Sequence, residues 1–273
     1  MKDILSGWRE HGLIKSKHIL VISILTVFVI ITSGIAYYLH SKKSEKEELE
    51  RKQQQTIINE KNKIRNFYST QFHGYQYQDL ITILGQILSS SYIFTYSGFT
   101  EDIFTCNEDS CDFSYKLKKG AIFNVQDKVF FNQSYEGIIS SDSIDFSGLA
   151  LKYADKALED KIINRPNNSF IPYCNDYINY IYAYNSSKSK EEDKIKLNEL
   201  PSSSVANLEN KYRDFADSHQ LLFSKFEMVL SANPLEVKYS LDKQPYLDSY
   251  VFKSIEKLST NNIKVTGVFA CKR

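Results

Sequence analysis

The sequence is poor in the residues that build phosphate-binding and catalytic loops. Only ten glycines occur in 273 residues, and none of them forms a glycine-rich loop that could hold a phosphate. The five histidines are scattered, and their spacing matches neither a metal site nor a nucleophile–base pair. Two Ser-x-x-Lys matches lack the companion motifs of acyl-transfer enzymes. We therefore expect a protein that is not an enzyme, without a metal or a cofactor.

The chain also lacks an excess of charge of either sign. It has 34 Lys and Arg residues against 33 Asp and Glu residues, which gives a formal net charge of +1. Nucleic-acid binding needs a concentrated basic surface, so we expect no nucleic-acid partner. Apolar residues make up 42% of the chain and include 17 Phe and 19 Tyr, enough to bury a core. The length fits one or two domains.

One long run has no charge at all. Residues 19–39 read ILVISILTVFVIITSGIAYYL. A membrane span needs about 20 apolar residues, and Tyr37 and Tyr38 stand where an interfacial aromatic belt would lie. A cleaved signal peptide is the alternative, because Gly34 and Ala36 form a small-x-small site. We expect a single transmembrane helix at 19–39, after a tail at 1–18.

Cysteine sets the expected orientation. Basic residues flank the apolar run on both sides, so the positive-inside rule does not choose between them. All four cysteines (Cys106, Cys111, Cys174 and Cys271) follow the run, and an even number on one side suggests disulfides in an oxidising compartment. The expected localisation is the bacterial inner membrane, with residues 1–18 in the cytoplasm and residues 40–273 in the periplasm.

The cysteine spacing points to disulfides more than to zinc. Cys106 and Cys111 are separated by four residues and lie between two expected strands, which suits a bridge that closes a hairpin. A zinc site would need two more Cys or His ligands nearby. Cys174 and Cys271 would then pair by default, although four cysteines allow three connectivities.

The segment after the apolar run is expected to be a helical stalk, at 40–68. It contains no glycine or proline and consists mainly of strong helix formers. Ile57 and Ile64 are seven residues apart, which allows a short coiled-coil seam. The alternative, which we favour, is a solvated stalk, because a seam needs three or four heptads.

The remaining sequence predicts an α+β fold. At 76–91, apolar residues at i, i+3, i+4, i+7 and i+8 predict an amphipathic helix. Further helices are expected at 147–163, 204–230 and 246–259. Strands are expected at 92–99, 101–106, 111–118, 177–184, 235–241 and 263–271, with more at 121–125 and 128–135. The expected organisation is one subdomain at 69–184, a linker at 185–204, and an α-β-α-β subdomain at 205–273.

Two groups of residues are candidate binding surfaces. Tyr177, Tyr180 and Tyr182 lie in the aromatic segment expected as a strand and are possible interface residues, although such strands more often form cores. Helical spacing would place Ile4, Leu5 and Trp8 on one side of the N-terminal tail. A tail of this size cannot build a core, so these side chains need a partner. The partner is either lipid headgroups or a protein groove.

The tail and the overall layout resemble a known family. In ILSGWRE, Trp8 is followed by Arg9 and Glu10. The layout resembles the inner-membrane alignment proteins of type IV pilus and type II secretion machines (the PilN and PilO type), in which such a tail binds an actin-like cytoplasmic adaptor. The strongest resemblance is to the bitopic biogenesis proteins of type IVb pili. It rests on size, topology, the cysteine pair followed by SYKLKKG, and the ending KVTGVFACKR.

This resemblance implies a ferredoxin-like periplasmic fold and a structural role. The partners that it implies are the inner-membrane platform protein, the assembly ATPase or its adaptor, and other bitopic proteins of the pilus complex, in a homo- or hetero-oligomer. Two other machines fit the same layout: a type IV secretion or conjugation scaffold, and a bitopic protein of the divisome.

Overall fold

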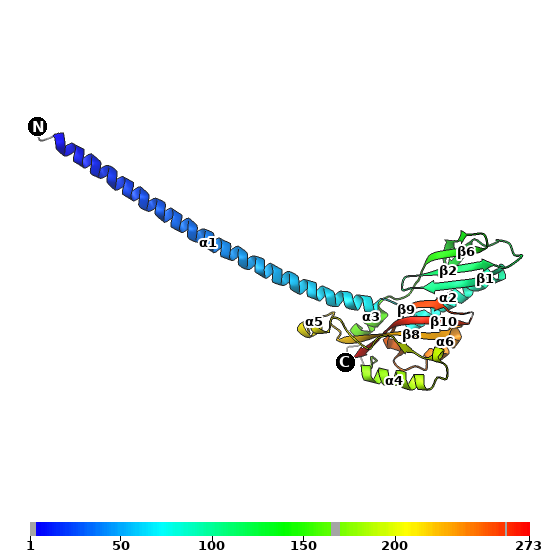
Figure 1. The fold of residues 1–273 in the computed structure, drawn as a ribbon. Coiled ribbons are helices and arrows are strands. Elements are labelled where there is room, and N and C mark those ends of the chain that lie inside the picture. Colours follow the sequence, from blue (N-terminus) through cyan, green and yellow to red (C-terminus); the bar gives the residue numbers. More distant parts are fainter. Residues whose placement is uncertain (1–3, 165–169, 260) are drawn as a thin grey trace. The chain divides into compact units, whose positions relative to one another are not determined.

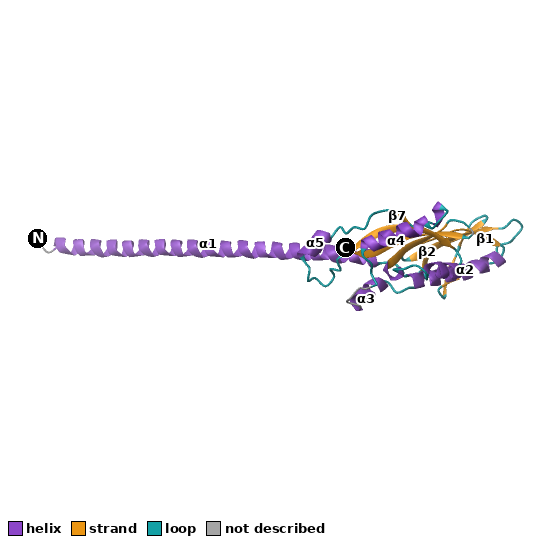
Figure 2. Cartoon of the chain, turned by 90° about the horizontal axis from the view of Figure 1, so that it is seen from below, coloured by secondary structure: helices purple, strands orange, loops and turns teal. Residues whose placement is uncertain are grey.

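The computed structural model describes residues 4–164, 170–259 and 261–273, with residues 4–24 described by their backbone alone. The chain divides into two compact units, residues 1–60 and residues 61–273. Helix α1 (Ile4–Phe72) belongs to both units. Figure 2 shows that α1 is helical throughout, and that the strands belong to the C-terminal unit, residues 61–273. Residues 40–68, which were expected as a helical stalk, are helical as part of α1, and this helix ends at Phe72.

Among the residues that the structure describes, no helix has both the length and the apolar character that a membrane crossing requires. This finding contradicts the expected transmembrane helix at 19–39, and with it the bitopic topology and the inner-membrane placement. Residues 19–24 lie among those described by backbone alone.

The C-terminal unit is built on an eight-stranded sheet with the strand order β5-β6-β2-β1-β9-β10-β8-β7 (Figure 1). Every pairing in this sheet is antiparallel. The strands are β1 (Phe99–Cys106), β2 (Ser110–Leu117), β5 (Ile138–Ile139), β6 (Ser143–Ala150), β7 (Lys196–Leu197), β8 (Leu221–Ser231), β9 (Tyr250–Lys257) and β10 (Asn262–Lys272). A separate hairpin pairs β3 (Asp127–Phe130) with β4 (Gln133–Glu136).

In the described part of the C-terminal unit, five helices accompany this sheet besides the end of α1. They are α2 (Tyr77–Tyr96), α3 (Ala157–Asn164), α4 (Cys174–Ser186), α5 (Ala206–Lys211) and α6 (Pro234–Leu241), with short 3₁₀ helices at Glu191–Asp193 and Leu247–Ser249. The expected α+β class is confirmed. The expected ferredoxin-like arrangement is wrong, because the elements do not follow the β-α-β-β-α-β order of that fold.

Two hydrophobic clusters use alternate residues of the same strands. On β8, Phe226 and Met228 belong to the first cluster, together with apolar residues of α2, α4 and α6. Phe223, three residues before Phe226, belongs to the second cluster, which also contains Ile64 and Tyr68 from the end of α1. Because side chains alternate between the faces of a strand, β8 and its neighbour β10 are covered on both faces. This burial fixes the last turns of α1 to the sheet.

Several expected elements were assigned correctly. The amphipathic helix at 76–91 is α2, whose apolar face buries Leu80, Ile83 and Leu84. Its first turn carries a capping box, in which the Gln76 backbone N–H donates to the Asp79 carboxylate over 3.2 Å. The strands expected at 101–106, 111–118 and 263–271 are β1, β2 and β10, and the stretch at 128–135 forms the β3–β4 hairpin.

Other expected elements were wrong. The segment 177–184 lies in helix α4, where Tyr177 and Ile181, four residues apart, face the core. The segment 235–241 is helix α6. Residues 92–96 continue α2, and 121–125 contains no strand. The expected helix at 147–163 contains the end of β6 and helix α3. The expected helix at 204–230 contains the short α5 and most of β8, and the one at 246–259 contains β9.

The expected linker at 185–204 does not separate two sheets. Its strand β7 pairs with β8, and the Asn185 side chain bonds both the N–H and the C=O of Ile195 over 2.9 and 2.8 Å. Strand β1, from the first expected subdomain, pairs with β9 from the second. Strands from both sides of the segment therefore share one sheet.

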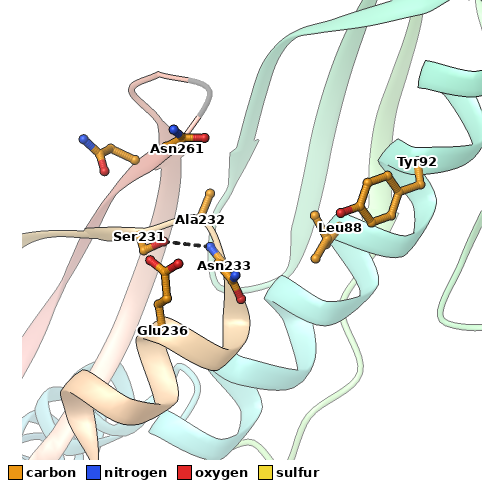
Figure 3. A pocket seen from close by; sticks show the side chains of 8 residues that line it. Leu88, Tyr92, Ser231, Ala232, Asn233, Glu236 and Asn261 are labelled. Carbon is orange, nitrogen blue, oxygen red and sulfur yellow. Dashed lines mark hydrogen bonds between the residues drawn. The ribbon is translucent and has the colours of Figure 1, made fainter.

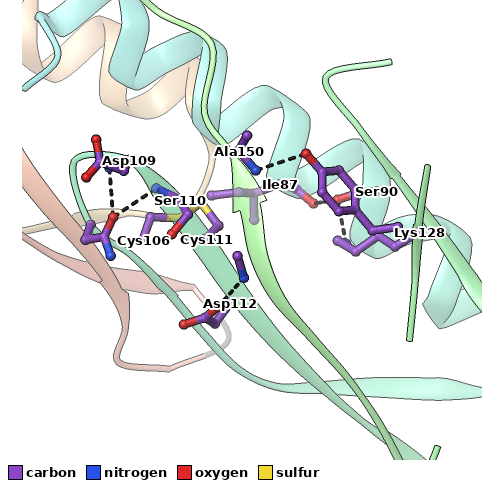
Figure 4. The surroundings of a disulfide bond; sticks show 12 residues. Ile87, Ser90, Cys106, Asp109, Ser110, Cys111, Asp112, Lys128 and Ala150 are labelled. Carbon is purple, nitrogen blue, oxygen red and sulfur yellow. Dashed lines mark hydrogen bonds between the residues drawn. A yellow bond between two sulfur atoms is a disulfide. The ribbon is translucent and has the colours of Figure 1, made fainter. Parts of the chain in front are cut away.

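Both expected disulfides are present. Cys106 and Cys111 face each other in the register of the β1–β2 hairpin, with 4.0 Å between their Cα atoms. Figure 4 shows this bridge beside the hairpin turn, where the Asn107 side chain accepts hydrogen bonds from the backbone N–H groups of Asp109 and Ser110. Cys174 and Cys271 join the first residue of α4 to β10 across 97 residues of sequence. The bridge expected to close a hairpin and the long-range pairing are both confirmed.

Candidate functional site

The residues expected to bind a partner through the N-terminal tail lie where only the backbone is described. They are Ile4, Leu5, Trp8, Arg9 and Glu10, and their backbone forms the first turns of α1. Their side chains lie outside the described residues. Partner binding by this tail therefore stays a prediction.

The remaining predicted interface residues differ in how far they are buried. Ile64 is fully buried in the second hydrophobic cluster, while Ile57 is 41% exposed in the N-terminal unit, residues 1–60. A buried Ile64 cannot contribute to a seam with another chain. Tyr177 is also fully buried, and its ring stacks on Phe269 with 3.2 Å between centroids. Of the three predicted tyrosines, Tyr180 packs partly against the core and Tyr182 is 70% exposed.

The apolar part of α1 presents its side chains to the outside. Between Leu25 and Leu39, ten large apolar residues are each more than half exposed: Leu25, Val27, Phe28, Val29, Ile30, Ile31, Ile35, Tyr37, Tyr38 and Leu39. The hydroxyl groups of Thr32 and Ser33 inside this stretch are bonded within the helix, because Thr32 donates to the Phe28 carbonyl and Ser33 to the Val29 carbonyl. The stretch is therefore a surface that needs a covering molecule.

A pocket lies where α2, the start of α6 and the β9–β10 turn come together (Figure 3). It has a volume of about 390 Å³. We call it the α2–α6 pocket, and it is lined by Leu88, Tyr92, Ser231, Ala232, Asn233, Glu236, Asn261 and Asn262. Leu88 and Tyr92 come from successive turns of α2, so their side chains share one face of that helix.

Local structure explains why the sequence forms this pocket. Strand β8 ends at Ser231, and Asn233 caps α6 by accepting a hydrogen bond from the Leu235 N–H over 3.0 Å. Pro234 follows at the first helical position, where its missing N–H is not needed. The Ala232 N–H donates to the Asn261 carbonyl over 2.8 Å, which joins the two loops of the pocket. Hydrogen bonds of the backbone and of the Asn233 side chain thus hold these lining segments in place.

A second polar site is enclosed between α2, β2 and the β3–β4 hairpin. Lys128 is 1% exposed, and its Nζ atom donates to the Tyr115 hydroxyl over 2.6 Å and to the Ser90 hydroxyl over 2.8 Å. Figure 4 shows the bond between Lys128 and Ser90. The Phe113 ring centroid lies 4.1 Å from the same nitrogen. Burial lowers the pKa of Lys128 to about 7, and the negative charge of Glu101 acts in the opposite direction.

This enclosed network extends to β9. The Glu101 carboxylate pairs with Lys257 over 2.9 Å and accepts a hydrogen bond from Ser91, whose oxygen lies 3.2 Å from the Tyr115 hydroxyl. A serine next to an uncharged lysine has the chemistry of a nucleophile and its base. Ser90 and Lys128 are almost fully buried, so a substrate has no access to them in this conformation. The network therefore joins α2, β1, β2, β3 and β9.

A third polar cluster anchors the end of α1. Glu209 is fully buried and accepts hydrogen bonds from the Tyr68 hydroxyl over 2.6 Å and from the Gln220 N–H over 2.9 Å. The Tyr68 oxygen in turn accepts from the Leu221 N–H over 3.0 Å. Burial and the neighbouring Glu209 raise the pKa of Tyr68, so its hydroxyl stays protonated. These bonds tie α1 to α5 and to the start of β8.

Sequence reasoning identified neither the α2–α6 pocket nor the Lys128 network. A signal for each exists in the sequence. Leu88 and Tyr92 are four residues apart, although the expected helix stops at residue 91, and Lys128 shares one face of an expected strand with Phe130. Among the described residues, no group of His, Cys, Asp and Glu is arranged to hold a metal ion. Comparisons with family models, with characterised proteins and with solved structures find no match for this chain.

Proposed function

We propose that this chain is a non-enzymatic structural component of a bacterial type IV pilus assembly machine, in which it binds partner proteins through α1. The observation that carries the proposal is the exposed apolar surface of α1 between Leu25 and Leu39. Ten large apolar side chains in contact with water are unfavourable, at about 25 cal/mol for each Å² exposed. Helices of partner chains that pack against this surface would remove that cost.

The pilus part of the proposal rests on the sequence resemblance. That resemblance includes the cysteine pair followed by SYKLKKG and the ending KVTGVFACKR. Both segments are structural in the fold: the first is the β1–β2 hairpin turn and β2, and the second lies in β10, between β9 and β8 in the sheet. In the proposed role, the C-terminal unit is a rigid body that the two disulfides and the core stabilise, and α1 connects it to other components.

The anchoring of α1 supports a mechanical role. Ile64, Tyr68 and Phe72 are buried in the second cluster, and the Tyr68 hydroxyl is bonded to Glu209. Three buried apolar side chains and a buried hydrogen bond fix the last turns of the helix to the sheet. In the proposed role, the end of α1 from Lys61 onward therefore moves together with the sheet of the C-terminal unit.

Affinity purification of the tagged full-length chain from crosslinked native cells, with mass spectrometry of what is captured, tests the proposal. We expect an assembly ATPase and a platform protein in the captured fraction. Phe28→Asp with Ile31→Asp places two charges on the exposed apolar surface and should abolish the capture. Glu47→Lys, on an exposed charged turn of the same helix, is the control and should leave the capture unchanged. Capture of mating-channel or septal proteins, or capture that survives the double substitution, would contradict the proposal.

A further inference from the structure

We propose that the α2–α6 pocket binds a neutral saccharide that carries an N-acetyl group. This site is separate from the surface of α1 on which the proposed function rests. A volume of about 390 Å³ falls within the range of small-molecule sites, about 300–1,000 Å³. The lining comes from separate segments of the chain: α2, the β8–α6 junction, α6 and the β9–β10 turn (Figure 3).

The charge of the lining excludes anionic ligands. Glu236 is the one charged side chain among the lining residues, and no Lys or Arg lines the pocket. A phosphate or carboxylate would face a negative charge with no cation to pair with it. A hydroxyl-rich neutral ligand fits, because a carboxylate accepts hydrogen bonds from hydroxyl groups. Among the described residues, Glu236 has no ion-pair or hydrogen-bond partner that would compete for its carboxylate.

Three asparagines supply the groups that recognise an amide. Each Asn side chain carries one carbonyl acceptor and an NH₂ donor. The carbonyl of Asn233 is used to cap α6, which leaves its NH₂ group for a ligand. The side chains of Asn261 and Asn262 have no partner within the described part of the chain. An acetamido group is itself an amide, so it can donate to an Asn carbonyl and accept from an Asn NH₂ group.

Tyr92 supplies an aromatic wall. It is 54% exposed, and Figure 3 shows its ring and Leu88 together on the α2 side of the pocket. One face of a pyranose ring presents C–H groups, which pack against an aromatic ring while the hydroxyl groups point to polar neighbours. Tyrosine offers such contact area at a low cost in side-chain entropy. The amide groups and the ring therefore match the two chemical sides of an acetamido sugar.

Hydrogen bonds connect the segments that line the pocket. The Asn233 N–H donates to the Ser231 hydroxyl over 3.1 Å, and the Ala232 N–H donates to the Asn261 carbonyl. The Leu258 N–H donates to the Asn262 carbonyl over 3.0 Å and closes the β9–β10 turn. These bonds join the β8–α6 junction to the β9–β10 turn, so residues from both segments line one pocket.

Titration of the purified full-length chain with N,N′-diacetylchitobiose, followed by isothermal calorimetry and by ligand-observed NMR, tests the proposal. Cellobiose, which has the same linkage but no acetamido group, is the matched ligand and should bind about tenfold more weakly or not at all. Tyr92→Ala and Asn261→Ala should each weaken binding by about tenfold, equal to about 1.4 kcal/mol. Asn233 is left unchanged because it caps α6.

Tyr96→Ala is the matched control variant. Tyr96 lies one turn further along α2, is 89% exposed and does not line the pocket, so its replacement should leave binding unchanged. Thermal unfolding of each variant, monitored by circular dichroism, verifies that the fold is intact. No binding of diacetylchitobiose, equal binding of cellobiose, or unchanged binding by folded Tyr92→Ala would overturn the proposal. Failure here would leave the proposed function standing, because that function is tested by substitutions in α1.

Discussion

The Nζ atom of Lys128 lies 2.6 Å from the phenol oxygen of Tyr115, and both side chains are enclosed in the core. This pair joins β3, part of a separate hairpin, to β2 in the main sheet. An uncharged amine can share hydrogen bonds with two hydroxyl groups without the large desolvation cost of a buried ammonium ion. The pair therefore stabilises the fold most when Lys128 is neutral.

Stability should consequently rise with pH between about 7 and 10. Burial lowers the pKa of Lys128 to about 7 from its ordinary value of 10.5, so in this range the unfolded chain binds the proton and the folded chain does not. The free energy of unfolding then increases by up to about 1.4 kcal/mol for each pH unit from this group. Urea denaturation at several pH values should show that Lys128→Met removes this part of the slope.

The matched control is Lys119→Met, which removes an exposed lysine after β2. Between pH 7 and 10, the free energy of unfolding of this variant should rise with pH as steeply as that of the wild type. Other buried groups, including Lys253, whose pKa burial also lowers, contribute equally to all three proteins. If the free energy of unfolding of Lys128→Met rises with pH as steeply as that of the wild type, Lys128 is charged in the folded protein.

Tyr68→Phe should destabilise the C-terminal unit by about 1–3 kcal/mol. The substitution keeps the ring in the second cluster but removes the hydroxyl group that donates to Glu209 and accepts from the Leu221 N–H. The buried Leu221 N–H would then lose its partner, and one Glu209 oxygen would lose its shortest bond. Urea denaturation measures the effect. Tyr96→Phe, at an exposed site, is the control and should change stability by less than about 0.5 kcal/mol.

Loss of the Cys174–Cys271 disulfide should lower the stability of the fold more than loss of the Cys106–Cys111 disulfide. In the loop-entropy description, a bridge across 97 residues contributes about 5 kcal/mol, and one across 5 residues contributes about 2 kcal/mol. Paired Cys→Ala substitutions at Cys174 and Cys271 should therefore lower the melting temperature further than the same change at Cys106 and Cys111. Differential scanning calorimetry makes the comparison, and equal losses would contradict this reasoning.

The sequence predicts best those elements whose signal is local. Leu80, Ile83 and Leu84 follow the helical period, and the cysteine pair marks a hairpin, so α2 and the β1–β2 turn were predictable. Segment 235–241 could also have been assigned, because Asn233 and Pro234 are a cap and a first-turn proline. Segment 177–184 reads as a strand because it is aromatic, yet Tyr177 and Ile181 have helical spacing toward the core.

Tertiary contacts determined the structure of the segments that local sequence patterns do not predict. Strand β9 occupies 250–257, a stretch with a helix-like pattern, because it lies between β1 and β10 and bonds to both. Such long-range pairing overrides local propensity. The pocket depends on the meeting of α2, α6 and the β9–β10 turn, which no local pattern reveals. The position of Lys128 against the aromatic rings of α2 and β2 likewise follows from the placement of a separate hairpin.

Removal of residues 1–60 should separate association from folding. The C-terminal unit is compact, and a chain that begins at Lys61 keeps Ile64, Tyr68 and Phe72, which pack into the second cluster. We expect this shorter chain to retain the circular dichroism spectrum of the sheet and to sediment as a monomer. The full-length chain should associate, because its exposed apolar side chains on α1 need partners. Analytical ultracentrifugation distinguishes the two. If the shorter chain associates as strongly as the full-length chain, the interacting surface lies on the C-terminal unit. If the full-length chain still associates when it carries Phe28→Asp and Ile31→Asp, the apolar surface of α1 is not the cause of the association.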